Sequence, residues 1–103
     1  MLPMTLDLET ISHKYKNIND WVQENARIMA NLVYQALEEI EKGKTDTITL
    51  IELCINGKCE YEILLDPLEA NYSAELNQQY WVDNEDYYRA ARVRDIRKKI
   101  HKN

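Results

Sequence analysis

The run TDTITLIELCINGKCEYEILLD, residues 45–66, constrains the fold more than any other part of this chain. Polar and apolar residues alternate on both sides of Asn56-Gly57, a dipeptide that suits a type I′ turn because both residues accept positive φ. We therefore expect a two-stranded antiparallel β-hairpin. A two-residue loop fixes the opposite pairs as Ile55 and Lys58, Cys54 and Cys59, Glu52 and Tyr61, Leu50 and Ile63, and Ile48 and Leu65.

This register divides the hairpin into two faces. The face expected to pack on a helix carries Ile48, Leu50, Cys54, Cys59, Tyr61, Ile63 and Leu65. The other face places Ile51, Leu53 and Ile55 among charged residues, and it is more apolar than a solvated face requires. Because an isolated hairpin is marginal in water, we expect terminal helices or another molecule to cover it.

Apolar residues before the hairpin follow a helical period. This period predicts a short helix over about 5–15 and a main helix over about 18–42. Asn17 is suited to cap the main helix, and Gly43 to end it. These two helices account for the N-terminal half of the fold.

A helical hairpin is expected over residues 66–101. Asp66-Pro67 is a typical helix start, and an apolar stripe then recurs at four-residue steps, formed by Leu68, Tyr72, Leu76 and Tyr80. Asp83-Asn84-Glu85 interrupts this stripe and offers a second N-cap, so a last helix would run to about Ile100. The fold class is α+β, and residues 1–103 are expected to form a single domain.

The sequence contains no catalytic signature, metal-ligand spacing or cofactor motif, so no catalytic residue, metal or cofactor is predicted. Glu52 is the one carboxylate that the hairpin register places on the covered face, opposite Tyr61. It could serve there as an acid, but such a residue more often lies at the rim of a sheet with its carboxylate in water. Cys54 and Cys59 face each other closely enough for a disulfide, but the absence of a secretory signal favours a cytoplasmic chain with reduced thiols. No apolar run is long enough to cross a membrane.

Charge is distributed unevenly along the chain. Residues 1–88 carry a balance of −11, whereas residues 89–103 carry +6. Basic residues in a last helical turn complement the helix dipole, but Arg89, Arg92 and Arg94 come too early in the helix for that reason. The basic end therefore predicts an acidic partner, which could be nucleic acid, an acidic protein surface or a second copy of this chain.

Residues 76–100, LNQQYWVDNEDYYRAARVRDIRKKI, resemble the UVR motif, a helical hairpin found in the excision-repair proteins UvrB and UvrC and in regulators of Clp-type proteases. The residues that carry the resemblance are Glu85, Asp86, Tyr87, Ala90, Ala91, Arg94, Asp95 and Ile100. Arg97 departs from the pattern, because the family has an apolar residue there. The resemblance implies a non-catalytic protein-interaction element whose surface comprises Tyr87, Ala90, Ala91, Arg94 and Asp95.

The leading expectation is thus a small cytoplasmic adaptor or inhibitor, of a kind that phages encode, which binds another protein or forms a homodimer. The first alternative is nucleic-acid binding through the basic helix, using Arg89, Arg92, Arg94, Arg97, Lys98, Lys99 and Lys102. The second is an acidic mimic of nucleic acid, using Glu38, Glu39, Glu41, Glu60 and Glu62.

Overall fold

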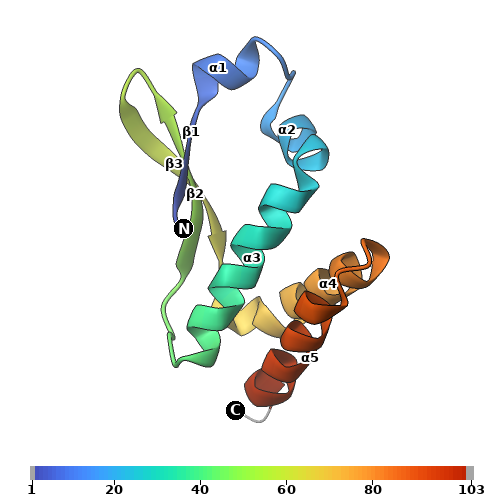
Figure 1. The fold of residues 1–103 in the computed structure, drawn as a ribbon. Coiled ribbons are helices and arrows are strands. Elements are labelled where there is room, and N and C mark those ends of the chain that lie inside the picture. The colour runs from blue at the N-terminus through green and yellow to red at the C-terminus, as the bar shows by residue number, and fades with distance from the viewer. Residues whose placement is uncertain (1, 102–103) are drawn as a thin grey trace.

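Residues 2–101 are described by the computed structural model, with side chains described for residues 2–100. The elements in chain order are β1 (Met4–Asp7), α1 (Leu8–Ser12), α2 (Ile18–Glu24), α3 (Ala26–Glu41), β2 (Ile48–Ile55), β3 (Lys58–Leu65), the 3₁₀ turn η1 (Pro67–Glu69), α4 (Ala70–Asp83) and α5 (Tyr87–His101). Helix α3 separates the sheet on one side from α4 and α5 on the other (Figure 1). The expected α+β class is confirmed.

The segment expected to be one short helix begins instead as a strand. Strand β1 pairs in parallel with β2, with Met4 opposite Ile51 and Asp7 opposite Cys54, so the sheet has three strands in the order β1-β2-β3. Side chains along β1 alternate between half-buried and exposed, as strand geometry requires. Asp7 then caps α1 by accepting a hydrogen bond from the Glu9 backbone N–H at 3.0 Å.

The main helix is likewise divided in two. Asn17 caps α2 as expected, accepting from the Asp20 backbone N–H at 3.0 Å. The helix breaks at Asn25, whose φ and ψ are −113° and 38° and whose Nδ2 donates to the Trp21 carbonyl oxygen. An asparagine side chain that bonds to nearby backbone favours such a break. Gly43, at φ 109°, follows the end of α3 as predicted.

The β-hairpin has the predicted turn but not the predicted register throughout. The pairs next to the turn are as expected, with Cys54 opposite Cys59, but Glu60 and Leu50 have no partner across the two strands. The middle is therefore shifted by one residue, and Glu52 lies opposite Glu62 instead of Tyr61. The observed middle pairs are Leu53 with Tyr61, Glu52 with Glu62, and Ile51 with Ile63.

This shift changes which side chains are covered. Ile51 and Leu53, expected on the outer face, are buried, whereas Tyr61, expected on the covered face, is 57% exposed. The bulge at Leu50 lets both Leu50 and Ile51 lie in the core, because it interrupts the strict alternation of the strand. The chain thus covers more aliphatic surface by bending the strand than a regular hairpin would allow.

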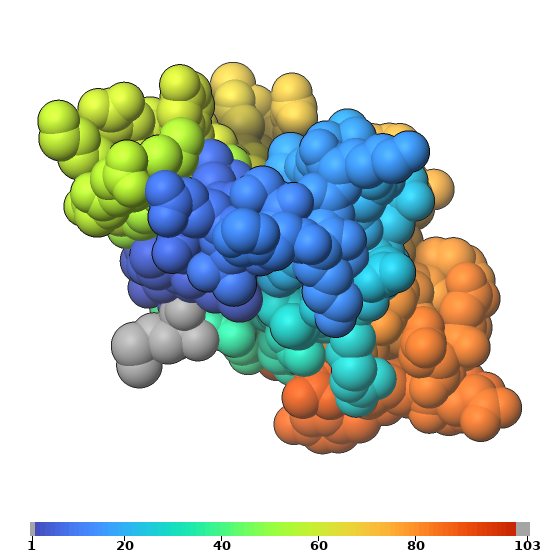
Figure 2. Space-filling model, turned by 90° about the horizontal axis from the view of Figure 1, so that it is seen from above, coloured from blue at the N-terminus to red at the C-terminus, as the bar shows by residue number. Residues whose placement is uncertain are grey.

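Two clusters of buried side chains lie on opposite sides of α3. The sheet-side cluster consists of Ile11, Trp21, Leu32, Ala36, Ile48, Leu50, Ile51, Leu53 and Leu65. The hairpin-side cluster consists of Ala30, Leu37, Ala70, Ala74, Trp81, Ala90, Val93 and Ile96. Seen from above, the tip of the β-hairpin and the helical hairpin lie on opposite sides of the molecule (Figure 2).

The helical hairpin starts as predicted, and α4 buries a face other than its apolar stripe. Asp66 accepts from the Leu68 backbone N–H at 3.0 Å, and Pro67 occupies the first turn. The apolar stripe at four-residue steps lies at the surface over most of its length, because Leu68, Tyr72 and Leu76 are all exposed. The buried residues of α4 are Ala70, Ala74, Asn77 and Trp81. Small residues on this face let α4 approach α3 closely.

Candidate functional site: the C-terminal helical hairpin

The turn between α4 and α5 uses a residue in the left-handed region. Glu85 has φ 59°, and its N–H donates to the Val82 carbonyl oxygen, while the Asp86 N–H donates to that of Trp81 at 2.8 Å. These two bonds complete a Schellman motif, which normally favours glycine at the Glu85 position. Glu85 is thus part of the connection, and the cap of α5 is not provided by the Asp83-Asn84-Glu85 stretch that was expected to offer it.

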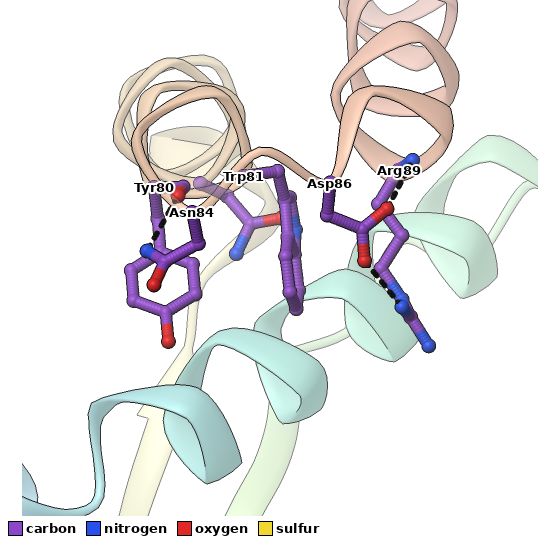
Figure 3. Close-up of polar contacts among 6 residues, drawn as sticks. Tyr80, Trp81, Asn84, Asp86 and Arg89 are labelled. Carbon is purple, nitrogen blue, oxygen red and sulfur yellow. Dashed lines mark hydrogen bonds and ion pairs between the residues drawn. The ribbon is translucent and has the colours of Figure 1, made fainter.

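Asp86 provides the start of α5. Its carboxylate accepts from the backbone N–H of Arg89 at 3.1 Å and from Arg89 Nη1 at 2.6 Å (Figure 3). These two bonds hold the pKa of Asp86 below its ordinary value. The acidic-aromatic beginning of the UVR-like stretch therefore has a local structural use, in which Asp86 caps the helix and Tyr87 follows it at the surface.

Trp81 is the centre of the contact between the hairpin and α3. It is fully buried, and its Nε1–H donates to Asn77 Oδ1 at 2.9 Å. Asn77 Nδ2 in turn donates to the Ala30 carbonyl oxygen of α3 at 3.0 Å. The guanidinium of Arg89 lies 5.0 Å from the indole, and that of Arg27 lies 5.6 Å away. Figure 3 shows Trp81 projecting from α4 toward α3, with Arg89 on the side of α5.

An ion-pair cluster closes the other end of this contact. Arg92 donates to both carboxylate oxygens of Glu41 at 2.6 and 2.9 Å, and its Nη2 also lies 3.8 Å from Glu38. Lys99 Nζ lies 3.3 Å from Glu41. These bonds lower the pKa of Glu41 to about 2 and raise the pKa of Arg92 above its usual range. The acidic end of α3 is thus neutralised by α5.

Most of the residues expected to bind anions therefore form hydrogen bonds or ion pairs with other residues of this chain. Arg89 bonds to Asp86, Arg92 and Lys99 to Glu41, and Arg97 Nη1 donates to Gln78 Oε1 at 2.8 Å. Lys98 is exposed, and Lys102 lies outside the described residues. The helix dipole does not account for the arginines in the first half of α5. These contacts account for two of them, since Arg89 and Arg92 bond to acidic side chains around the helix.

The residues carried over from the UVR resemblance separate into inward and outward sets. Ala90 is buried with Val93 and Ile96, so it does not lie on the surface where the resemblance groups it with Tyr87. Tyr87, Arg94 and Asp95 are exposed and Ala91 is half-buried. Helical spacing puts these four on one side of α5. The expected grouping of Ala90 with Tyr87 fails because Ala90 is small enough for the close approach of α3 and α4.

A shallow groove of about 340 Å³ lies between α4 and α5. Its lining residues are Asn71, Gln78, Arg94, Arg97 and Lys98. The sequence pattern did not indicate this groove, because Asn71 and Gln78 come from a helix whose polar positions carry no motif. The sequence feature that could have indicated the groove is the seven-residue spacing of Asn71 and Gln78, which places both amides on the same face of α4.

The structure also shows the surroundings of the cysteines and of Glu52, the other residues considered for a chemical role. Cys54 and Cys59 form a disulfide, so the expectation of reduced thiols is wrong for this structure. Glu52 is half-buried and lies opposite Glu62, which removes the expected pairing with the Tyr61 hydroxyl. Within residues 2–101, no three His, Cys, Asp or Glu side chains are grouped closely enough to hold a metal ion.

The chain was compared with protein families, curated proteins and solved structures. No family model, curated protein or solved structure matches the chain. Among the helices that the structure describes, none is long and apolar enough to cross a membrane.

Proposed function

We propose that this chain is a non-catalytic adaptor or inhibitor that binds another protein through the outward surface of its helical hairpin. The supporting observation is the distribution of exposed apolar side chains over the molecule. Six of the ten exposed large hydrophobic side chains in the described residues belong to the segment from η1 to the start of α5, namely Leu68, Tyr72, Leu76, Val82, Tyr87 and Tyr88. Apolar side chains gathered on one surface favour a protein-binding role.

The outward surface has two parts. On α4, Leu68, Tyr72 and Leu76 recur at four-residue steps, so they form one continuous stripe opposite the buried alanines. On α5, Tyr87 and Arg94 accompany the half-buried Ala91. The UVR resemblance implies the same use of this hairpin, including pairing between two hairpins, so a homodimer is one form that the proposed interaction can take.

The two alternatives have less support. A nucleic-acid-binding helix would need its cations available to phosphates, but Arg89, Arg92 and Lys99 are bonded to Asp86 and Glu41. An acidic mimic would need a continuous acidic surface, but Glu41 is likewise neutralised. The proposal keeps a cytoplasmic location, which the disulfide of Cys54 and Cys59 opposes because cytosolic thiols are usually reduced.

The test is capture of a partner from a lysate of the source cell, with and without nuclease. The surface variant is Tyr72→Glu with Leu76→Glu, whose side chains are 65% and 55% exposed. The matched control is Tyr61→Glu with Leu64→Glu on β3, where the same residue types are 57% and 51% exposed. Circular dichroism of both variants checks that each remains folded.

We expect a protein that survives nuclease, is lost with the α4 variant and is retained by the β3 control. Introduced carboxylates would have to be desolvated against an apolar partner surface, which costs several kcal/mol and abolishes capture. Equal capture by both variants would contradict the proposal. Recovery of nucleic acid without a protein would instead support the basic-helix alternative.

A further inference from the structure

The groove between α4 and α5 has an unusual composition for a chain with a net charge of −5. Its lining contains three cations, Arg94, Arg97 and Lys98, and two amides, but no carboxylate. Arg97 is held in place because its Nη1 donates to Gln78 Oε1 at 2.8 Å. The groove therefore offers hydrogen-bond donors and positive charge at a fixed position on the outward surface.

Arg94 and Lys98 differ from Arg89 and Arg92 in what their side chains contact. Among the described residues, Arg94 has one polar partner, Asp95, which it contacts through Nε at 3.3 Å, and both side chains are more than half exposed. Within the described residues, the terminal nitrogens of Arg94 and the ammonium of Lys98 have no hydrogen-bond acceptor. Arg92 joins α5 to α3 through its ion pair with Glu41, whereas Arg94 and Lys98 form no such contact with another helix in the described part of the chain.

We propose that this groove binds carboxylate side chains of an acidic segment in the protein partner, an inference that rests on the proposed function. A guanidinium fork matches a carboxylate with two parallel hydrogen bonds, and such charge-assisted bonds are about twice as strong as neutral ones. Arg94 provides the fork, Lys98 adds a second charge, and Asn71 adds an amide donor. Together they can satisfy one or two carboxylates without any charge from outside the groove.

The surroundings favour a short acidic protein segment over a nucleic-acid backbone. Glu75 lies between Asn71 and Gln78 in the spacing of α4, and Asp95 adjoins Arg94 on α5, so negative charge borders the groove. A continuous line of phosphates would meet these carboxylates, whereas a few isolated acidic side chains would not. The exposed apolar stripe of α4 is on the same helix and suits a segment that mixes acidic and apolar residues.

The direct test is a titration of the full chain, followed by the backbone amide signals in NMR. The probes are a short peptide of glutamate, serine and leucine, the same peptide with glutamine in place of glutamate, and a single-stranded oligonucleotide. We expect signals of α4 and α5 near the groove to shift, and the glutamate peptide to bind about tenfold more tightly than the glutamine peptide. Equal binding of the two peptides, or tighter binding of the oligonucleotide, would overturn the inference.

A charge-reversal pair separates this inference from the proposed function. Arg94→Glu with Lys98→Glu is compared with Lys16→Glu with Lys58→Glu, an equal change in charge at exposed positions outside the helical hairpin. We expect the groove variant to lose the lysate partner and the control to retain it. If the groove variant retains a partner that the Tyr72→Glu, Leu76→Glu variant loses, the proposed function stands and the acidic-segment inference is wrong. If neither variant loses a partner, both are wrong.

Discussion

The two sides of α3 are stabilised in different ways. Toward the sheet, the buried residues are mainly aliphatic, and Leu32, Leu50 and Ile51 are representative. Toward the hairpin, four of the eight buried residues are alanines, and Trp81 is the largest fully buried side chain in the described residues. The sheet side thus depends on aliphatic side chains of similar size, whereas the hairpin side packs Trp81, Leu37, Val93 and Ile96 among small alanines.

Polar contacts follow the same division. Asn77, the one buried polar residue in the described part of the chain, belongs to the hairpin side, as does the pair between Arg92 and Glu41. Alanines allow three helices to approach closely but bury little area each. The hairpin side therefore depends on a few directional contacts, and single substitutions there should have larger local effects than on the sheet side.

Trp81→Ala is expected to have the largest effect. Removing a fully buried tryptophan costs about 3–5 kcal/mol of unfolding free energy, because both its apolar area and its packing are lost. Trp21, on the sheet side, then becomes the sole tryptophan. In urea, we expect the helical signal in circular dichroism to be lost before the Trp21 fluorescence changes. Coincident transitions would show that the two sides unfold as one unit and would break the comparison.

Asn77→Ala tests the polar part of the same contact. It removes the acceptor of the Trp81 N–H and the donor to the Ala30 carbonyl, leaving a buried indole N–H unpaired. We expect a loss of about 2 kcal/mol in urea unfolding. Asn71→Ala, an exposed amide on the same helix, is the control and should have little effect. Helix propensity alone favours alanine in both variants, so a similar loss in both variants, or no loss in Asn77→Ala, would contradict the role of the two hydrogen bonds.

Glu41→Gln tests the ion-pair cluster and its dependence on pH. The loss of two charge-assisted bonds from Arg92 should cost about 1.5 kcal/mol at neutral pH. The pKa of Glu41 falls from 4.5 to about 2 in the folded chain. Because the folded pKa is depressed, the carboxylate contributes fully above about pH 5, and its contribution is lost as the pH falls towards 2.

The stability difference between wild type and Glu41→Gln should therefore shrink across that window. Thermal unfolding at several pH values measures it. Glu39→Gln, at an exposed position of α3, is the matched control for the loss of one carboxylate and should have a small effect at neutral pH. A difference for Glu41→Gln that stays constant down to pH 2 would refute the assignment.

Glu85→Gly should give the smallest effect, and it should be stabilising. Glu85 adopts φ 59°, which costs a non-glycine residue about 1–2 kcal/mol. The larger unfolded-state entropy of glycine offsets about 0.4–1 kcal/mol of this, so we expect a net gain of about 0.5 kcal/mol. Glu85→Ala is the control and should bring no gain, because alanine shares the backbone cost. The equivalent position after α3 already carries Gly43, so this substitution would make the two helix ends alike. Chemical unfolding measures the difference.

Local signals in the sequence predicted local structure well. The Asn56-Gly57 turn, the Asn17 cap, the Gly43 helix end and the Asp66 helix start are all confirmed, because each depends on residues a few positions apart. The parallel strand β1 was missed, since its partner lies in β2, far along the sequence. The register shift was missed for a similar reason, because bulges respond to what the sheet must cover.

The candidate site was predicted only in part. The hairpin and the positions of Tyr87, Arg94 and Asp95 at its surface agree with the sequence pattern. The buried face of α4 was not predicted, because that helix carries two stripes of similar spacing, and periodicity does not say which one is buried. The stripe with Ala70 and Ala74 is buried because close helix packing favours small residues over the larger Leu and Tyr side chains.

The central claim is that α5 uses one set of cations to hold the fold together and another to bind a partner. The most direct measurement compares Arg92→Gln with the double variant Arg94→Gln, Lys98→Gln for thermal stability and for capture of the lysate partner. We predict that Arg92→Gln lowers the melting temperature and retains capture below that temperature, because Arg92 bonds to Glu41. The double variant should melt like wild type and lose capture. The opposite result, in which Arg92→Gln loses capture and the double variant loses stability, would contradict this division.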